Sequence, residues 1–200
     1  MAVHMPMPTF EPLPINHPRM EELTGRLKTF APIIVDRVPM PLPHGACYWN
    51  VRQTIERFGG SMIVGWNVMW YPAFRIEANH HAIWKTTTGR YLDVTKNSIP
   101  GRFSFLEEIE SRTLDLRYPV AIKNEFIELQ DHPLLSQLKD CYLEWVDLNY
   151  RLNAMERELG SSYDPYQGGW QNIHPDAGLV NMRNDVQHLI QKYLVLLRMI

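Results

Sequence analysis

The chain has 200 residues, 45% of them hydrophobic, and a formal net charge of −2. This length suits one substantial domain with or without an appendage, and the composition is that of a globular protein. The sequence contains no basic excess and no run of about 18 apolar residues, so we expect neither a nucleic acid nor a membrane as partner.

The two cysteines and the N-terminus indicate a compartment. Cys47 and Cys141 are too few for a disulfide framework, and one reactive and one packed thiol suit a reducing environment. Prolines interrupt the first eight residues, and no apolar segment typical of a signal peptide follows them. We therefore expect a cytoplasmic protein.

Residues 1–43 hold nine of the fifteen prolines, which excludes a long helix. We expect an extended N-terminal arm on the surface, with one short helix within 18–30. Two further parts follow, a catalytic core over 44–100 and a helical extension over 101–200 that packs on the core.

A short helix is predicted to begin at Cys47. Pro43 and Gly45 disfavour helix before it, and Val51, Ile55 and Phe58 then recur with helical spacing. The pair at 59–60, both glycine, ends the pattern because glycine readily adopts the left-handed conformation of a helix cap.

After this helix the period changes to that of strands. Apolar residues alternate over 61–70, a second strand is expected over 75–85, and a turn at Thr88 and Gly89 leads into a third over 90–95. The result is one helix followed by an antiparallel β-meander.

Within the meander, His81 and Asp93 lie at similar distances from the hairpin turn, so a cross-strand or diagonal contact is expected. His80 points to the opposite face because successive strand residues alternate. A nucleophilic site requires three such groups. A thiol stands at a helix start, an imidazole takes the proton of the thiol, and a carboxylate orients the imidazole.

This order of residues resembles the papain-like superfamily of cysteine enzymes. A Cys at a helix start, a His-Ala-x-Trp strand from His81 and an Asp-Val-Thr segment from Asp93 are most similar to the transglutaminase-like and arylamine-acetyltransferase-like branch. The resemblance covers roughly 45–96 and implies an α+β fold with Cys47 as nucleophile, His81 as general base and acid, and Asp93 as orienter. Val94 stands where the family has proline. The expected oxyanion donor is the Cys47 backbone N–H, with His44 and Asn50 as side-chain alternatives.

The predicted function is cysteine-dependent acyl transfer on a peptide or amide substrate through a thioester, without a cofactor. Hydrolysis, as a peptidase or amidase, is favoured over transfer to an amine or deamidation of the transglutaminase type. A non-catalytic papain-like interaction module is the alternative from another class. A zinc site is disfavoured because His80 and His81 point to opposite faces.

The C-terminal half is predicted to be helical. The segment 104–107 has the pattern of a capping box, which predicts a helix into the region of Glu110. Two longer helices, one from Pro133 to Gly160 and one from Pro175 onward, carry matching apolar stripes, and the first includes Cys141 as a core residue. They are expected to form an antiparallel hairpin, or alternatively the seam of a homodimer. Tyr163, Tyr166 and Trp170 in the connecting loop are expected to pack rather than to line a substrate groove.

Overall fold

The computed structural model describes residues 10–199 except 73, 98–100, 111 and 168. It is an α+β structure, with 37% helix and 30% strand, as predicted. The chain divides into two compact units, one of residues 10–116 with 124–127, and one whose described residues are 117–123 and 128–199. β2 lies within the predicted arm and β6 within the predicted extension, so the two units do not follow the predicted boundaries at 43 and 100.

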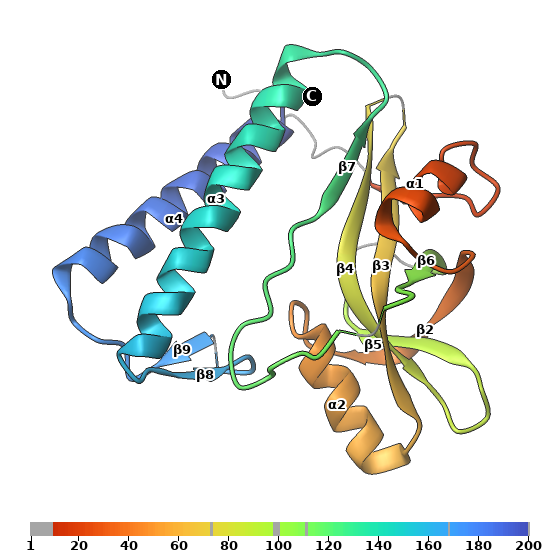
Figure 1. Ribbon diagram of the computed structural model, residues 1–200, viewed down its shortest axis with the longest axis horizontal. Coiled ribbons are helices and arrows are strands. Elements are labelled where there is room, and N and C mark those ends of the chain that lie inside the picture. Colours follow the sequence, from red (N-terminus) through yellow and green to blue (C-terminus); the bar gives the residue numbers. More distant parts are fainter. Residues whose placement is uncertain (1–9, 73, 98–100, 111, 168, 200) are drawn as a thin grey trace. The chain divides into compact units, whose positions relative to one another are not determined.

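The first unit is built on a seven-stranded sheet, with strands in the order β1-β3-β6-β2-β5-β4-β7 (Figure 1). An additional pairing of β3 with β4 closes five of these strands, β3, β6, β2, β5 and β4, into a barrel. The strands and helices of this unit are β1 (Glu11–Pro12), α1 (Met20–Leu27), β2 (Ile33–Leu42), α2 (Cys47–Phe58), β3 (Ser61–Tyr71), β4 (Arg75–Lys85), β5 (Tyr91–Thr95), β6 (Phe103–Glu107) and β7 (Glu125–Glu128).

A hydrophobic cluster fills the barrel. Each of the five strands contributes to it, because alternate residues of a strand face the same side. Its members are Val35, Ile83, Phe103 and Phe105, with Ile33, Ile63 and Tyr91 packed around them. His81 and Asp93 lie two residues along their strands from Ile83 and Tyr91 and therefore face the same side as this cluster.

Helix α2 and the three strands after it confirm the predicted helix and meander. Gly59 has a φ of 70° and donates its N–H to Ile55, as expected for the residue that ends the helix. β3 and β4 pair antiparallel along their whole length, and β4 pairs with β5 through Trp84–Leu92 and Lys85–Tyr91. α2 packs against β4, β5 and β3.

Strand β3 also requires glycine at one position. A Cβ on Gly65 would lie 2.1 Å from the carbonyl oxygen of Leu106, so a side chain there would push β3 and β6 apart. Gly65 is also the partner of His81 in the pairing of β3 with β4. The close approach of β3 and β6 therefore occurs beside the candidate site.

The prediction of an N-terminal surface arm is wrong in part over 10–43, and residues 1–9 of that arm lie outside the described residues. The short helix expected within 18–30 is present as α1, but the rest of the arm is not confined to the surface. β2 is an interior strand, antiparallel to β6 and parallel to β5. Its Pro39 and Pro41 lie where the register with β5 shifts, a place where a missing N–H donor is tolerated.

The helix predicted from the capping box at 104–107 is wrong, because this segment is strand β6. Phe103 and Phe105 both turn into the barrel, a period of two that a helix does not satisfy. The Ser104 hydroxyl, which would have capped the helix, donates instead to the carbonyl of Leu13. Tertiary pairing thus overrides the local signal.

The second unit contains the predicted helical hairpin. α3 (Pro133–Glu158) and α4 (Ala177–Leu197) pack together through Leu152, Leu179 and Val186, with further apolar residues around them. Cys141 is buried, at 2% exposure, and Leu159 at the end of the predicted stripe is exposed. Neither these helices nor any other in the described part of the chain has both the length and the apolar character needed to cross a membrane.

The connection between these helices forms a small hairpin of β8 (Ser162–Asp164) and β9 (Gly169–Gln171). Tyr163 contacts the Trp170 ring at 5.6 Å, and the Trp170 indole donates to Asn153 of α3. These two aromatic residues pack the hairpin, as expected, while Tyr166 is exposed.

Candidate functional site

The three predicted residues converge in the first unit. Cys47 is the first residue of α2, His81 lies in β4 and Asp93 in β5. His81 Nε2 lies 3.1 Å from Asp93 Oδ1, and the same imidazole lies close enough to Cys47 for the cysteine to raise the pKa of His81. Because Asp93 occupies Nε2, Nδ1 is the ring nitrogen left for the thiol.

The paths of β4 and β5 explain how a helix outside the barrel reaches an inward-facing histidine. Among the described residues, β4 and β5 pair at two positions, Trp84 with Leu92 and Lys85 with Tyr91. The pairing ends before it reaches His81. Beyond these pairs β5 runs beside β2, where Asp93 is the partner of Arg37. The start of α2 therefore meets His81 where the two strands separate.

Asp93 is fully buried and well held. Its Oδ1 accepts from the backbone N–H of Thr95 at 2.9 Å as well as from His81. Its Oδ2 faces Arg37, whose Nε lies 3.7 Å away. The Arg37 guanidinium in turn lies over the Phe103 ring, 4.9 Å from its centroid. A buried carboxylate with these partners is positioned to orient an imidazole and to stabilise its cation.

The same contacts determine the charge of His81. Burial lowers the pKa of His81, but the attraction of Cys47 and the hydrogen bonds to Asp93 and Cys47 outweigh burial and raise this pKa to about 10. The imidazolium form is therefore favoured at neutral pH. A cation in this place is the partner that a cysteine thiolate requires.

His80 has a different environment, which separates the two adjacent histidines. Its Nδ1 lies 2.5 Å from the Tyr48 hydroxyl, and its Nε2 lies 3.3 Å from Glu108 Oε1. Burial lowers the pKa of His80 to about 4, although Glu108 opposes this shift. His80 is thus neutral where His81 is cationic, and it faces Tyr48 rather than the thiol, as strand alternation predicts.

The side-chain candidates for an oxyanion donor do not fit. Asn50 is fully buried, and its amide nitrogen donates to the Pro43 carbonyl at 2.8 Å and to Thr95 Oγ1 at 3.1 Å, so both amide hydrogens are used. Asn50 joins the start of α2 to the end of β5. His44 is exposed. The Cys47 backbone N–H remains the candidate, because the first N–H groups of a helix have no intrahelical acceptor.

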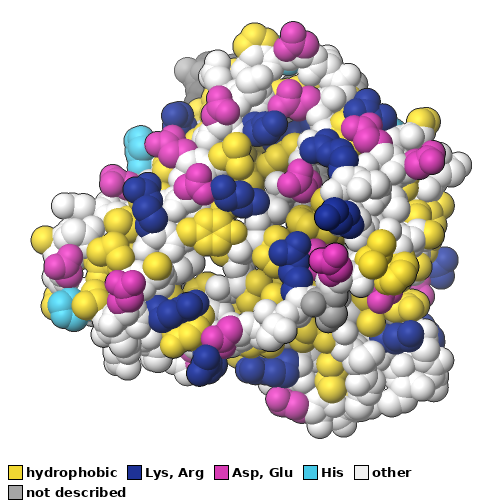
Figure 2. Space-filling view, viewed as in Figure 1, with side chains coloured by type: hydrophobic (Ala, Val, Ile, Leu, Met, Phe, Trp, Pro, Cys, Tyr) yellow, Lys and Arg dark blue, Asp and Glu magenta, His cyan; other side chains and the backbone are white. Residues whose placement is uncertain are grey.

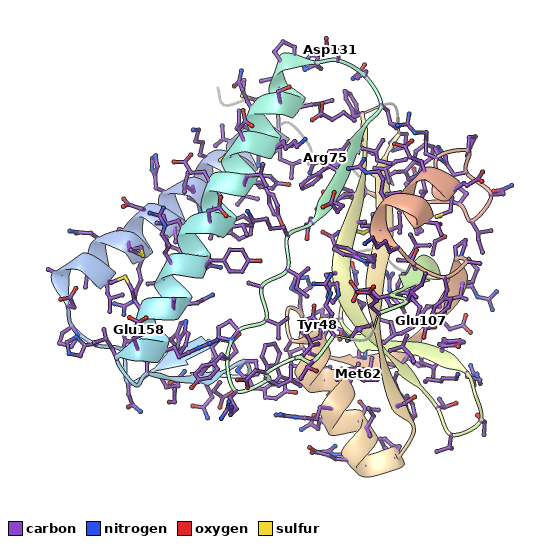
Figure 3. The ribbon with its side chains drawn as sticks, in the orientation of Figure 1. Tyr48, Met62, Arg75, Glu107, Asp131 and Glu158 are labelled. Atoms are coloured by element: carbon purple, nitrogen blue, oxygen red, sulfur yellow. The ribbon has the colours of Figure 1, made fainter. Side chains whose placement is uncertain are left out.

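Sequence reasoning missed four residues around the predicted three. Arg37 and Thr95 contact Asp93, and Tyr48 and Glu108 contact His80. Tyr48 stands directly after Cys47, and Figure 3 labels it at the N-terminal end of α2. Arg37 and Glu108 carry no local signal, since their positions depend on the pairing of distant strands.

Within the residues that the structure describes, no three His, Cys, Asp or Glu side chains gather closely enough to hold an ion.

Charges of both signs are interspersed over the face shown in Figure 2, so a field of one sign does not dominate that surface.

The resemblance to papain-like enzymes remains a prediction. Comparison with family models, with curated proteins and with solved structures finds no match to the chain.

Proposed function

We propose that this protein is a cysteine-dependent acyl-transfer enzyme, with hydrolysis of an amide or peptide as its reaction. One observation carries the proposal. A largely buried histidine lies beside a cysteine at a helix start and contacts a buried aspartate, and the pKa of this histidine is raised to about 10. A structural cysteine in an apolar core would not require a cationic partner.

The reaction follows from these roles. The Cys47 thiolate attacks the carbonyl carbon, and the negative charge that develops on the carbonyl oxygen is stabilised by the Cys47 N–H and the positive end of α2. His81 then donates its proton to the leaving amine as the C–N bond breaks, which leaves a thioester. A water molecule gives a proton to His81 and attacks the thioester, releasing the carboxylic acid and restoring the Cys47–His81 pair. Asp93 orients the imidazole throughout.

Alkylation by iodoacetamide tests the activation of Cys47. In the wild type, Cys47 is expected to react at pH values well below those at which an ordinary thiol ionises, because His81 stabilises the thiolate. In His81→Gln this low-pH reactivity is expected to disappear. Cys141 is the internal control, since burial raises the pKa of Cys141. An ordinary titration of Cys47, unaffected by His81→Gln, would contradict the proposal.

Acylation by p-nitrophenyl acetate tests the chemistry itself. The expected result is an acetyl group on Cys47, detected by mass, and its loss over time in water. Cys47→Ser is expected to lack the adduct, and an added amine that captures the acetyl group would show transfer in place of hydrolysis. A protein that gains no acetyl group at Cys47 is not an acyl-transfer enzyme of this kind.

A further inference from the structure

The first two residues of α2 contact the two adjacent histidines of β4. Cys47 lies beside His81 and raises the pKa of that imidazole, and the Tyr48 hydroxyl lies 2.5 Å from His80 Nδ1. Adjacent residues of a strand point to opposite faces, so the two contacts lie on opposite sides of β4. Contacts at two such points restrict both the translation and the rotation of the helix start relative to the strand.

The Tyr48 contact continues through two buried groups, His80 and Glu108, to Arg112, which is about half exposed. The His80 and Glu108 side chains are 1% and 5% exposed, with 3.3 Å between Nε2 and Oε1. Glu108 accepts from Arg112 Nε through both carboxylate oxygens, at 2.9 and 2.8 Å. The edge of the Trp66 ring also packs on His80, with 4.9 Å between ring centroids.

The protonation of His80 is consistent with this arrangement. His80 is neutral because burial lowers its pKa to about 4. Its Nδ1 therefore accepts from the Tyr48 hydroxyl, while Nε2 carries the proton that faces the Glu108 carboxylate. His80 thus uses one ring nitrogen as an acceptor for Tyr48 and directs the other toward Glu108, at ion-pair distance.

We propose that Tyr48, His80, Glu108 and Arg112 form a positioning network that holds the start of α2 on β4 and thereby holds the Cys47 thiol against His81. The network acts through Tyr48, the neighbour of the nucleophile, and its members do not react with substrate. This inference rests on the proposed function, since it concerns the activation of the same thiol.

Tyr48→Phe and Glu108→Gln test the network. The first removes the hydroxyl that faces His80, the second removes the carboxylate charge that holds Arg112, and each keeps the shape of the side chain. In both variants the rate of Cys47 alkylation at about pH 6 is expected to fall about fivefold to tenfold, the factor that the loss of one hydrogen bond produces. The pH midpoint of alkylation is expected to move toward that of an ordinary thiol.

Trp49→Phe is the matched control. Trp49 follows Tyr48 in the same helix, and its indole donates to the Leu116 carbonyl at 2.8 Å, so this variant also loses a buried hydrogen bond. The urea concentration at the midpoint of unfolding is expected to fall in Trp49→Phe. The pH profile of Cys47 alkylation is expected to stay that of the wild type.

The outcomes separate this inference from the proposed function. Wild-type profiles in Tyr48→Phe and Glu108→Gln, beside a wild type whose low-pH reactivity depends on His81, would overturn the positioning network alone. An equal shift in Trp49→Phe would also overturn it, since general loosening of α2 would then explain the effect. A wild-type Cys47 that titrates as an ordinary thiol would overturn the proposed function instead.

Discussion

Asp93 is the most enclosed member of the candidate site, and its two oxygens have separate partners. Oδ1 accepts from His81 and from the Thr95 backbone, while Oδ2 faces Arg37. This division gives each carboxylate oxygen a partner of its own, which a buried carboxylate requires because an isolated buried anion would be costly.

Asp93→Asn is expected to lower the rate of Cys47 alkylation at about pH 6 by roughly 10- to 100-fold, because a charge-assisted hydrogen bond to His81 is lost. Asp36→Asn is the matched control. Asp36 lies next to Arg37 in β2, but its carboxylate is half-exposed and pairs with Arg102. Equal rates in Asp93→Asn and the wild type would show that Asp93 does not support His81.

The two adjacent histidines, His80 and His81, differ in charge although they are neighbours in the chain. His81 is held as a cation by Cys47 and Asp93, whereas His80 is held neutral by burial beside Tyr48. Composition or spacing alone does not distinguish them. Strand alternation does, since it directs His81 into the barrel and His80 to the other face.

Among the elements, the start of α2 determines whether the site can exist. The N-cap residue Ala46 makes no side-chain cap hydrogen bond. Asn50 supplies a different anchor, because its amide joins the Pro43 carbonyl before the helix to Thr95 at the end of β5. The same Thr95 donates its N–H to Asp93, so the anchor links the helix to the orienting carboxylate.

Asn50→Ala is expected to lower the free energy of unfolding by about 1 to 3 kcal/mol, the cost of leaving buried polar partners unpaired. Urea unfolding followed by tryptophan fluorescence measures this change. Arg52→Ala on the exposed side of α2 removes a surface pair with Glu56, at 3.9 Å, and is expected to cost less than about 1 kcal/mol. If both variants lost the same stability, Asn50 would not anchor the helix.

At the scale of the whole molecule, His80 links stability to pH. The pKa of His80 falls from 6.5 to about 4 on folding, chiefly through burial. Below about pH 6.5 the unfolded chain therefore binds a proton that the folded protein excludes. Above about pH 6.5 His80 is neutral in both states and stability does not depend on it, and between about pH 6.5 and about pH 4 the free energy of unfolding falls progressively.

The wild type is expected to lose about 3 kcal/mol of stability through this group between about pH 6.5 and about pH 4. His80→Gln is expected to be less stable than the wild type at neutral pH, but its free energy of unfolding is expected to fall less on acidification than that of the wild type. Urea unfolding at several pH values measures both changes. His44→Gln, at an exposed position, is expected to keep the wild-type pH dependence. A His80→Gln variant with the wild-type dependence would exclude His80 as the source.

Much of the first unit follows from short-range patterns. Helix α2 is predicted by flanking proline and glycine and by apolar spacing, and the hairpin of β4 and β5 by its turn. The contact of His81 with Asp93 then follows from counting along the hairpin. These features depend on residues close together in the chain, so local conformational preference and side-chain alternation suffice.

The barrel and the surroundings of the site depend on distant segments. The prolines of β2 led to the prediction of an extended arm, whereas this segment is a strand that pairs with both β5 and β6. The capping-box pattern in β6 likewise predicted a helix where the structure has a strand. Those pairings bring Arg37 to Asp93, and the fold places Glu108 beside His80. Local patterns in the chain establish the order of Cys47, His81 and Asp93, but their partners come from long-range pairing, where burial in the barrel outweighs local preference.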